Sequence, residues 1–119
     1  MTKSDIEIIE DGGATIAVLG TEYDNLNDDN LMAASETLLS LASRVEPPKL
    51  ILDLSQTRFF ASAFLGALFR VWNRLSHRGG SMAMCCPSEV CADVLRVTNV
   101  AKLWGIYQTR QEAIDALTK

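Results

Sequence analysis

Ser62 is the side chain in this 119-residue sequence whose position most favours a chemical role. It follows an apolar run at residues 50–54 and a short polar break, and it stands where the apolar spacing of a long helix begins. A strand that leads through a turn into a helix places the turn at the carboxyl end of a sheet. Ligands and partners of α/β proteins usually bind there. The sequence therefore points first to Ser62.

Two enzyme classes are excluded by the surroundings of Ser62. A serine nucleophile needs a base within hydrogen-bond reach, but the single histidine, His77, lies fifteen residues further along the same predicted helix. That separation is about 22 Å. A phosphate-binding loop needs glycines and a lysine between strand and helix, and residues 55–58 (SQTR) contain neither. What remains for Ser62 is a role as the substrate of another enzyme or as a helix cap.

The three cysteines, Cys85, Cys86 and Cys91, do not form a recognisable metal motif. Their spacing matches no common zinc pattern, and the chain has only one histidine. We expect reduced, mostly packed thiols, and neither a metal nor a cofactor. A thiol-redox role is a weaker alternative.

Ser62 itself has two interpretations. Serine is a favoured N-cap residue, because its hydroxyl accepts a hydrogen bond from a free amide of the first helical turn. The same position would suit a phosphoserine, since the helix dipole and the unpaired N–H groups favour negative charge there. A phosphate on Ser62 would then change the charge that a docking partner meets.

A stripe of four residues on the predicted helix would face such a partner. At 100° per residue, Ser62, Gly66, Phe69 and Asn73 lie beside the apolar face. Gly66 costs about 1 kcal/mol relative to alanine within a helix. Either a partner or a neighbouring element of the same chain would explain the bare backbone, and Phe69 could belong to the core.

The apolar spacing predicts one α/β domain over residues 1–119, with the order β-β-α-β-α-β-α-β-α. The alternation of strands and helices indicates a mostly parallel sheet, which an N-terminal hairpin at Asp11-Gly12-Gly13 makes mixed. We expect residues 20–27 to form a loop and Val90, Val94 and Val97 to form the buried face of the third helix. The expected strands are 6–9, 14–19, 50–54, 82–86 and 104–107, and the expected helices run from about 27 to 46, from 62 to 77, from 87 to about 99, and from the capping box at 109–112 onward.

Charge and composition bear on which classes of partner and which cell compartment we expect. The net charge of −4 argues against nucleic-acid binding. Residues 1–46 hold ten acidic and two basic residues, whereas residues 47–119 hold five acidic and nine basic residues. This asymmetry reflects either ordinary solvated faces or a surface that orients a protein partner. The sequence has no signal-peptide pattern and no membrane-span pattern, so we expect a cytoplasmic protein.

The sequence resembles the STAS domain family, named for sulfate transporters and anti-sigma factor antagonists. The resemblance covers nearly the whole chain and is best over residues 48–117. It rests on the apolar strand ending in Asp53-Leu54, on the segment Ala61-Ser62-Ala63-Phe64-Leu65-Gly66, and on the elements that follow in family order.

The resemblance implies that the chain is a non-enzymatic regulator, an anti-sigma factor antagonist that works by partner switching, and that Ser62 is its phosphoacceptor. An anti-sigma kinase would bind the unphosphorylated form and then phosphorylate it, and a phosphatase would reverse the step. The partner surface would comprise Asp24, Ala61, Ser62, Ala63, Gly66, Phe69 and Asn73. Ala61 and Ala63-Phe64 depart from the family pattern, which has aspartate before the serine and Ser-Gly after it, and Asp24 is the nearest match to a second family aspartate.

Two other functions keep the same fold. The domain could be an unphosphorylated scaffold in a signalling or transport assembly, which Ala61 favours, with Ser62 acting only as a helix cap. A nucleotide- or anion-binding module is the third class, and ligand-dependent thermal stabilisation would reveal it. The sequence indicates no oligomeric state.

Overall fold

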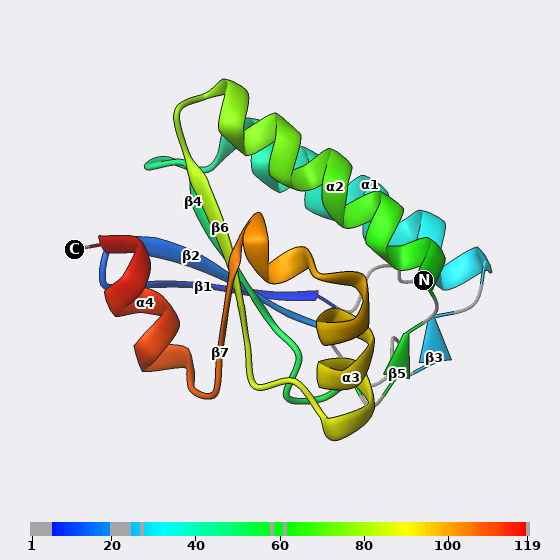
Figure 1. Ribbon diagram of the computed structural model, residues 1–119. Helices are drawn as coiled ribbons and strands as arrows, with labels where there is room; N and C mark the ends of the chain where they lie inside the picture. Colours follow the sequence, from blue (N-terminus) through cyan, green and yellow to red (C-terminus); the bar gives the residue numbers. More distant parts are fainter. Residues whose placement is uncertain (1–5, 20–24, 27, 58, 61, 119) are drawn as a thin grey trace.

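The computed structural model describes residues 6–19, 25–26, 28–57, 59–60 and 62–118. For residues 25, 26, 28–31, 59, 60, 62, 63 and 101 it describes the backbone alone. Within this part of the chain, a five-stranded mixed sheet lies between two helical layers (Figure 1). The α/β class predicted from the sequence is confirmed.

The sheet has the strand order β1-β2-β4-β6-β7. Strands β1 and β2 pair antiparallel, and every other neighbouring pair in this sheet is parallel. The mixed, mostly parallel sheet was therefore predicted correctly. The strands are β1 (Ile6–Asp11), β2 (Ala14–Leu19), β4 (Lys49–Asp53), β6 (Ser81–Cys85) and β7 (Gly105–Tyr107).

The N-terminal hairpin turns at Gly12 and Gly13, as expected. Asp11 pairs with Ala14, so the turn contains only these two glycines. Their φ angles are +62° and +92°, a backbone region that side-chain-bearing residues rarely adopt. Glycine at both positions thus permits the tight connection that makes the sheet mixed.

Of the four α-helices in the described part of the chain, three cover one face of the sheet and the fourth covers the other (Figure 1). Alternate residues of the central strands face the two layers: Leu50 and Leu52 pack in the core beneath α1, α2 and α3, whereas Ile51 packs beneath α4. The helices are α1 (Asp28–Arg44), α2 (Ser62–His77), α3 (Glu89–Thr98) and α4 (Arg110–Thr118), with a short 3₁₀ helix, η2 (Val100–Lys102).

Helices α2 and α4 agree closely with the prediction. Helix α2 has the predicted bounds, and its predicted apolar stripe faces the core. The capping box of α4 also forms, because the Glu112 N–H donates to the Thr109 hydroxyl (3.1 Å) and the Thr109 N–H donates to the Glu112 carboxylate (3.2 Å). Local sequence signals therefore suffice to place both helices.

Two short strands were missed. Strand β3 (Asn25–Leu26) lies within the segment predicted as a loop, and β5 (Phe59–Phe60) lies in the connection between β4 and α2. They form a separate two-stranded parallel sheet, in which Asn25 pairs with Phe59 and Leu26 with Phe60. Two residues are too few to show a periodic pattern, and the pairing joins distant segments of the chain.

The buried face predicted for α3 was wrong for two of its three valines. Cys91 and Leu95 are buried and Val94 packs beside them, whereas Val90 is 49% exposed and Val97 is 77% exposed. The three valines share a helix face, but only Val94 lies next to the face that contacts the core. The apolar spacing alone predicted that the most hydrophobic side of the helix faces the core, whereas the structure buries the side of Cys91 and Leu95.

Several boundaries shift by one or two residues. Strand β4 ends at Asp53 and β6 ends at Cys85, one residue earlier than predicted in each case. Helix α3 begins at Glu89, after Ser88 as its N-cap. Among the described residues, no helix has the length and apolar character needed to cross a membrane.

Candidate functional site

The start of α2 is the candidate functional site, and Ser62 is the first residue of this helix. His77 is the last residue of the same helix, so the two residues occupy opposite ends, as the sequence predicted. Strand β5 ends two residues before Ser62 and pairs with β3. The small β3–β5 sheet therefore joins the segment that follows β2 to the segment that leads into α2.

Part of the predicted site is outside the described residues. Asp24 and Ala61 are not described, and the backbone alone is described for Ser62 and Ala63. Asn25, the residue after Asp24, pairs with Phe59 in the β3–β5 sheet. The roles predicted for these four side chains remain predictions.

Gly66 has an open environment on the outer side of α2. It is exposed, and apart from its chain neighbours and the nearby backbone of its own helix, no described atom lies within 4 Å of where a Cβ atom would stand. Close packing against another element of the chain was one explanation of this glycine, and the described part of the chain does not support it. The backbone of α2 at Gly66 is open to an approaching partner.

Phe69 and Asn73 continue the same stripe. Asn73 is exposed, and Phe69 is 42% exposed. The Phe69 ring meets the buried Trp104 ring edge-on, with 5.7 Å between the ring centroids. Phe69 therefore presents part of its ring to solvent from a fixed position and is not a core residue.

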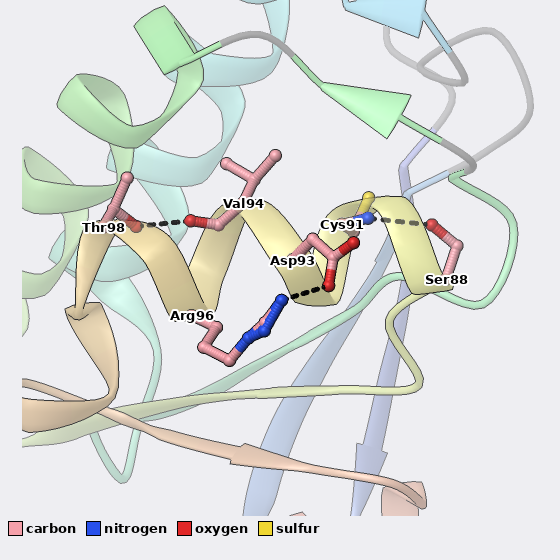
Figure 2. Close-up of polar contacts among 6 residues, drawn as sticks. All are labelled: Ser88, Cys91, Asp93, Val94, Arg96 and Thr98. Atoms are coloured by element: carbon pink, nitrogen blue, oxygen red, sulfur yellow. Dashed lines mark hydrogen bonds and ion pairs between the residues drawn. The ribbon is translucent and has the colours of Figure 1, made fainter.

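Helix α3 is attached to the connection that leads into β5. The Ser88 hydroxyl caps α3 by accepting a hydrogen bond from the Cys91 N–H (3.1 Å; Figure 2). The Cys91 thiol in turn donates to the Thr57 carbonyl oxygen, which is 3.7 Å from Sγ. Both Cys91 and Thr57 are buried. These contacts hold the approach to α2 against α3.

Helix α3 contains two further polar contacts between its own residues. The Thr98 hydroxyl donates to the Val94 carbonyl oxygen (2.7 Å), and Arg96 pairs with Asp93 (2.6 Å; Figure 2). The side chains of Arg96 and Asp93 are both largely exposed. The cation on this helix is therefore balanced locally by a neighbouring anion.

Asp53 was singled out in the sequence only as part of the family motif, and its structural partner, Arg110, was not predicted. The Arg110 guanidinium donates two hydrogen bonds to Asp53 Oδ2, at 2.8 and 3.1 Å, and the Ser55 N–H donates to Oδ1 at 2.8 Å. Burial raises the pKa of Asp53, but the hydrogen bonds from Ser55 and Arg110 together lower it by more than burial raises it. The pKa of Asp53 therefore lies below its ordinary value. The pair joins the end of β4 to the start of α4.

Two cysteines lie beside this ion pair. One ligand-type atom from each of Asp53, Cys85 and Cys86 lies within 4.8 Å of the other two. Both carboxylate oxygens of Asp53 already accept hydrogen bonds, and burial raises the pKa values of both thiols. A cation would need the carboxylate and two thiolates, so this arrangement favours an ion pair beside neutral thiols. Cys85, Cys86 and Cys91 are free cysteines, as predicted.

Comparisons with known proteins agree with this geometry. The family model described as "STAS domain" matches residues 7–113. Two relatives from Thermotoga neapolitana and Thermotoga maritima, each named as a candidate anti-sigma factor antagonist, are 33% identical over 67 residues and 31% identical over 71 residues. The matches cover 56% and 60% of this chain and span only 59% and 63% of the relatives' own lengths.

A solved structure resembles the whole fold. The anti-sigma-factor antagonist (STAS) domain protein of Planctomyces limnophilus superposes with a TM-score of 0.87 at 29% identity. The superposition covers 96% of this chain and 98% of that protein. Since the family model spans most of the sequence and the sheet, hairpin and helices follow the same plan, this chain belongs to the STAS domain family.

Proposed function

We propose that this chain is an anti-sigma factor antagonist that switches partners when Ser62 is phosphorylated. The unphosphorylated form binds an anti-sigma factor with serine kinase activity in the cytoplasm and thereby frees the sigma factor. Phosphorylation of Ser62 by that kinase ends the complex, and a phosphatase restores the binding form. In this function the chain is a substrate and a ligand, not a catalyst.

One observation carries the proposal: Ser62 opens a sixteen-residue helix whose adjoining outer stripe is exposed. The amides of the first helical turn lack intrahelical acceptors, and the helix dipole places positive potential beside them. A phosphoserine at this position therefore adds about two negative charges where the backbone can accept them. The domain would keep its fold while its docking surface changes charge.

The exposed stripe supplies the rest of the binding surface. Gly66 lets another chain approach the helix backbone, and Phe69 offers part of an aromatic ring held by Trp104. Burial of such a ring is a common anchor of protein interfaces. A phosphate on Ser62 would lie at the amino-terminal end of this surface. Its negative charge would weaken the binding of a partner that is complementary to the uncharged serine.

Ala61 favours the alternative function, a STAS scaffold in which Ser62 is never phosphorylated. The family pattern has an aspartate at this position, and its loss removes a group that a kinase could recognise. It also removes a negative charge next to the acceptor serine. The two functions therefore differ in recognition by a kinase, not in the stability of the phosphorylated product.

A pull-down with four baits separates the two functions. The baits are the wild-type chain, Ser62→Ala, Ser62→Glu, and Ser76→Glu as a control that adds the same charge at an exposed serine near the other end of α2. Partner switching predicts that an anti-sigma factor binds wild type, Ser62→Ala and Ser76→Glu but not Ser62→Glu. Phosphopeptide mass spectrometry of wild type after incubation with the captured kinase and ATP should then locate the phosphate on Ser62.

The scaffold alternative predicts a different result. All four baits would then retain the same partners, and incubation with ATP would leave Ser62 unmodified. Loss of binding with both glutamate variants would show a general effect of negative charge along α2, and it would contradict a specific switch at Ser62.

A further inference from the structure

The outer surface of α2 has two unlike flanks. Phe69 and Trp104 lie on the side toward η2, and Arg70 and Arg74 lie on the side toward α1. Helical spacing places both arginines next to the stripe of Gly66 and Asn73. The stripe thus runs between an aromatic edge and a basic edge.

The basic edge is not neutralised from within the helix. Helix α2 contains no aspartate or glutamate, and its last residue is His77. Arg74 donates to the Ser43 hydroxyl of α1 (2.6 Å), an uncharged partner that orients the guanidinium without cancelling its charge. Arg70 is exposed and has no ion-pair partner among the described residues. The next arginine, Arg78, is paired with Glu46, so the excess charge is concentrated at Arg70 and Arg74.

This concentration of charge contrasts with the whole chain, whose net charge is −4. An acidic protein that presents a basic edge beside its candidate docking helix orients an incoming partner, because opposite surface potentials select one approach. The neighbouring Phe69 ring gives that partner an apolar anchor.

From this arrangement we infer that α2 docks a protein whose surface carries carboxylates opposite Arg70 and Arg74 and an apolar side chain opposite Phe69. This inference rests on the proposed function, because it assigns a chemistry to the partner of the same helix. It also gives a second physical reason for switching, since a phosphate on Ser62 would repel an acidic partner along the whole stripe.

The test uses a defined acidic probe, a fluorescein-labelled oligoglutamate peptide, and fluorescence anisotropy at low and physiological salt. We expect wild type to bind the peptide and to lose most of that binding as salt rises. The double variant Arg70→Glu/Arg74→Glu should bind about tenfold more weakly or not at all. The single variant Arg70→Glu should also bind more weakly than wild type. Arg96→Glu is its matched control, because it reverses one exposed charge on α3, and it should bind like wild type once circular dichroism shows that all variants are folded.

Several outcomes would overturn the inference. Wild type that fails to bind the peptide at low salt would show that the basic edge attracts no carboxylates, and an equal loss with Arg96→Glu would show that binding is spread over the surface. A DNA duplex that binds more tightly than the peptide would assign the edge to nucleic acid instead.

The peptide test and the pull-down can fail separately. If the peptide binds through Arg70 and Arg74 but all four pull-down baits retain the same partners, then the acidic-partner surface stands and the switch fails. If the switch holds but the peptide does not bind, the partner meets α2 through other contacts.

Discussion

Arg110, the first residue of α4, donates two hydrogen bonds to a single carboxylate oxygen of Asp53, the last residue of β4. Fifty-seven positions separate the two residues in the sequence. The Asp53 side chain is 2% exposed and the Arg110 side chain is 37% exposed, so the carboxylate is the buried partner. This pair fixes the helix that covers the second face of the sheet.

The substitution Arg110→Ala should destabilise the fold. Removing one partner of a buried ion pair costs about 3–5 kcal/mol, but solvent already screens part of the Arg110 charge and the Ser55 N–H still serves the carboxylate. We therefore expect the free energy of unfolding to fall by about 2 kcal/mol in urea denaturation. Arg96→Ala, which breaks the exposed pair with Asp93, should cost less than about 0.5 kcal/mol. Equal losses for both variants would contradict a structural role for the buried pair.

The pH dependence of stability should reveal the same pair. The pKa of Asp53 is lower in the folded chain than in the unfolded chain, where it is about 3.9. Its contribution is therefore complete above that unfolded value and is lost as the pH falls through the lower folded value. Wild type should exceed Asp53→Asn in unfolding free energy near pH 6, and the difference should shrink below about pH 4. A constant difference over the whole series would mean that Asp53 is not the group responsible.

The two sides of α3 should respond differently to truncation. Leu95 is buried, whereas Val97 is largely exposed. Leu95→Ala should lower the free energy of unfolding by about 2–4 kcal/mol, because it leaves a cavity in the core. Val97→Ala should change it by less than about 0.5 kcal/mol. If urea denaturation shows that the two variants lose similar amounts of unfolding free energy, the valine side of α3 is buried, as the spacing of the valines predicted.

The sequence predicted the elements whose signals are local. The two glycines predicted the hairpin, and the apolar stripe predicted α2. The Thr109 and Glu112 side chains predicted the start of α4. Each of these signals lies within one turn or one helix, so it can be read without knowing the tertiary structure. For the candidate site, the same local signals placed Ser62 at the start of α2 and the residues Gly66, Phe69 and Asn73 on an exposed or partly exposed stripe. The binding role of these residues stays a prediction.

The features that were missed depend on contacts between distant segments. Pairing of Asn25 with Phe59 requires the loop after β2 to meet the segment before α2. The ion pair of Asp53 with Arg110 requires the end of β4 to meet the start of α4. The orientation of α3 depends on which side the sheet contacts, and the spacing of three valines does not contain that information.

Gly66→Ala should separate stability from binding at the candidate interface. A methyl group at Gly66 would meet no described atom of another element, so alanine should raise the free energy of unfolding by about 1 kcal/mol through its better helix propensity. The same methyl group would hold a partner away from the α2 backbone, so the anti-sigma factor captured by wild type should bind Gly66→Ala more weakly in calorimetry.

Gly80→Ala is the contrasting control, because its added Cβ would overlap the Pro48 carbonyl group. That variant should be destabilised, and any binding that it loses should track the loss of fold. A Gly66→Ala chain that is more stable and binds the partner as tightly as wild type would show that no partner approaches this part of α2. The stripe beside Ser62 would then be a solvent-facing surface, and the docking site would have to lie elsewhere.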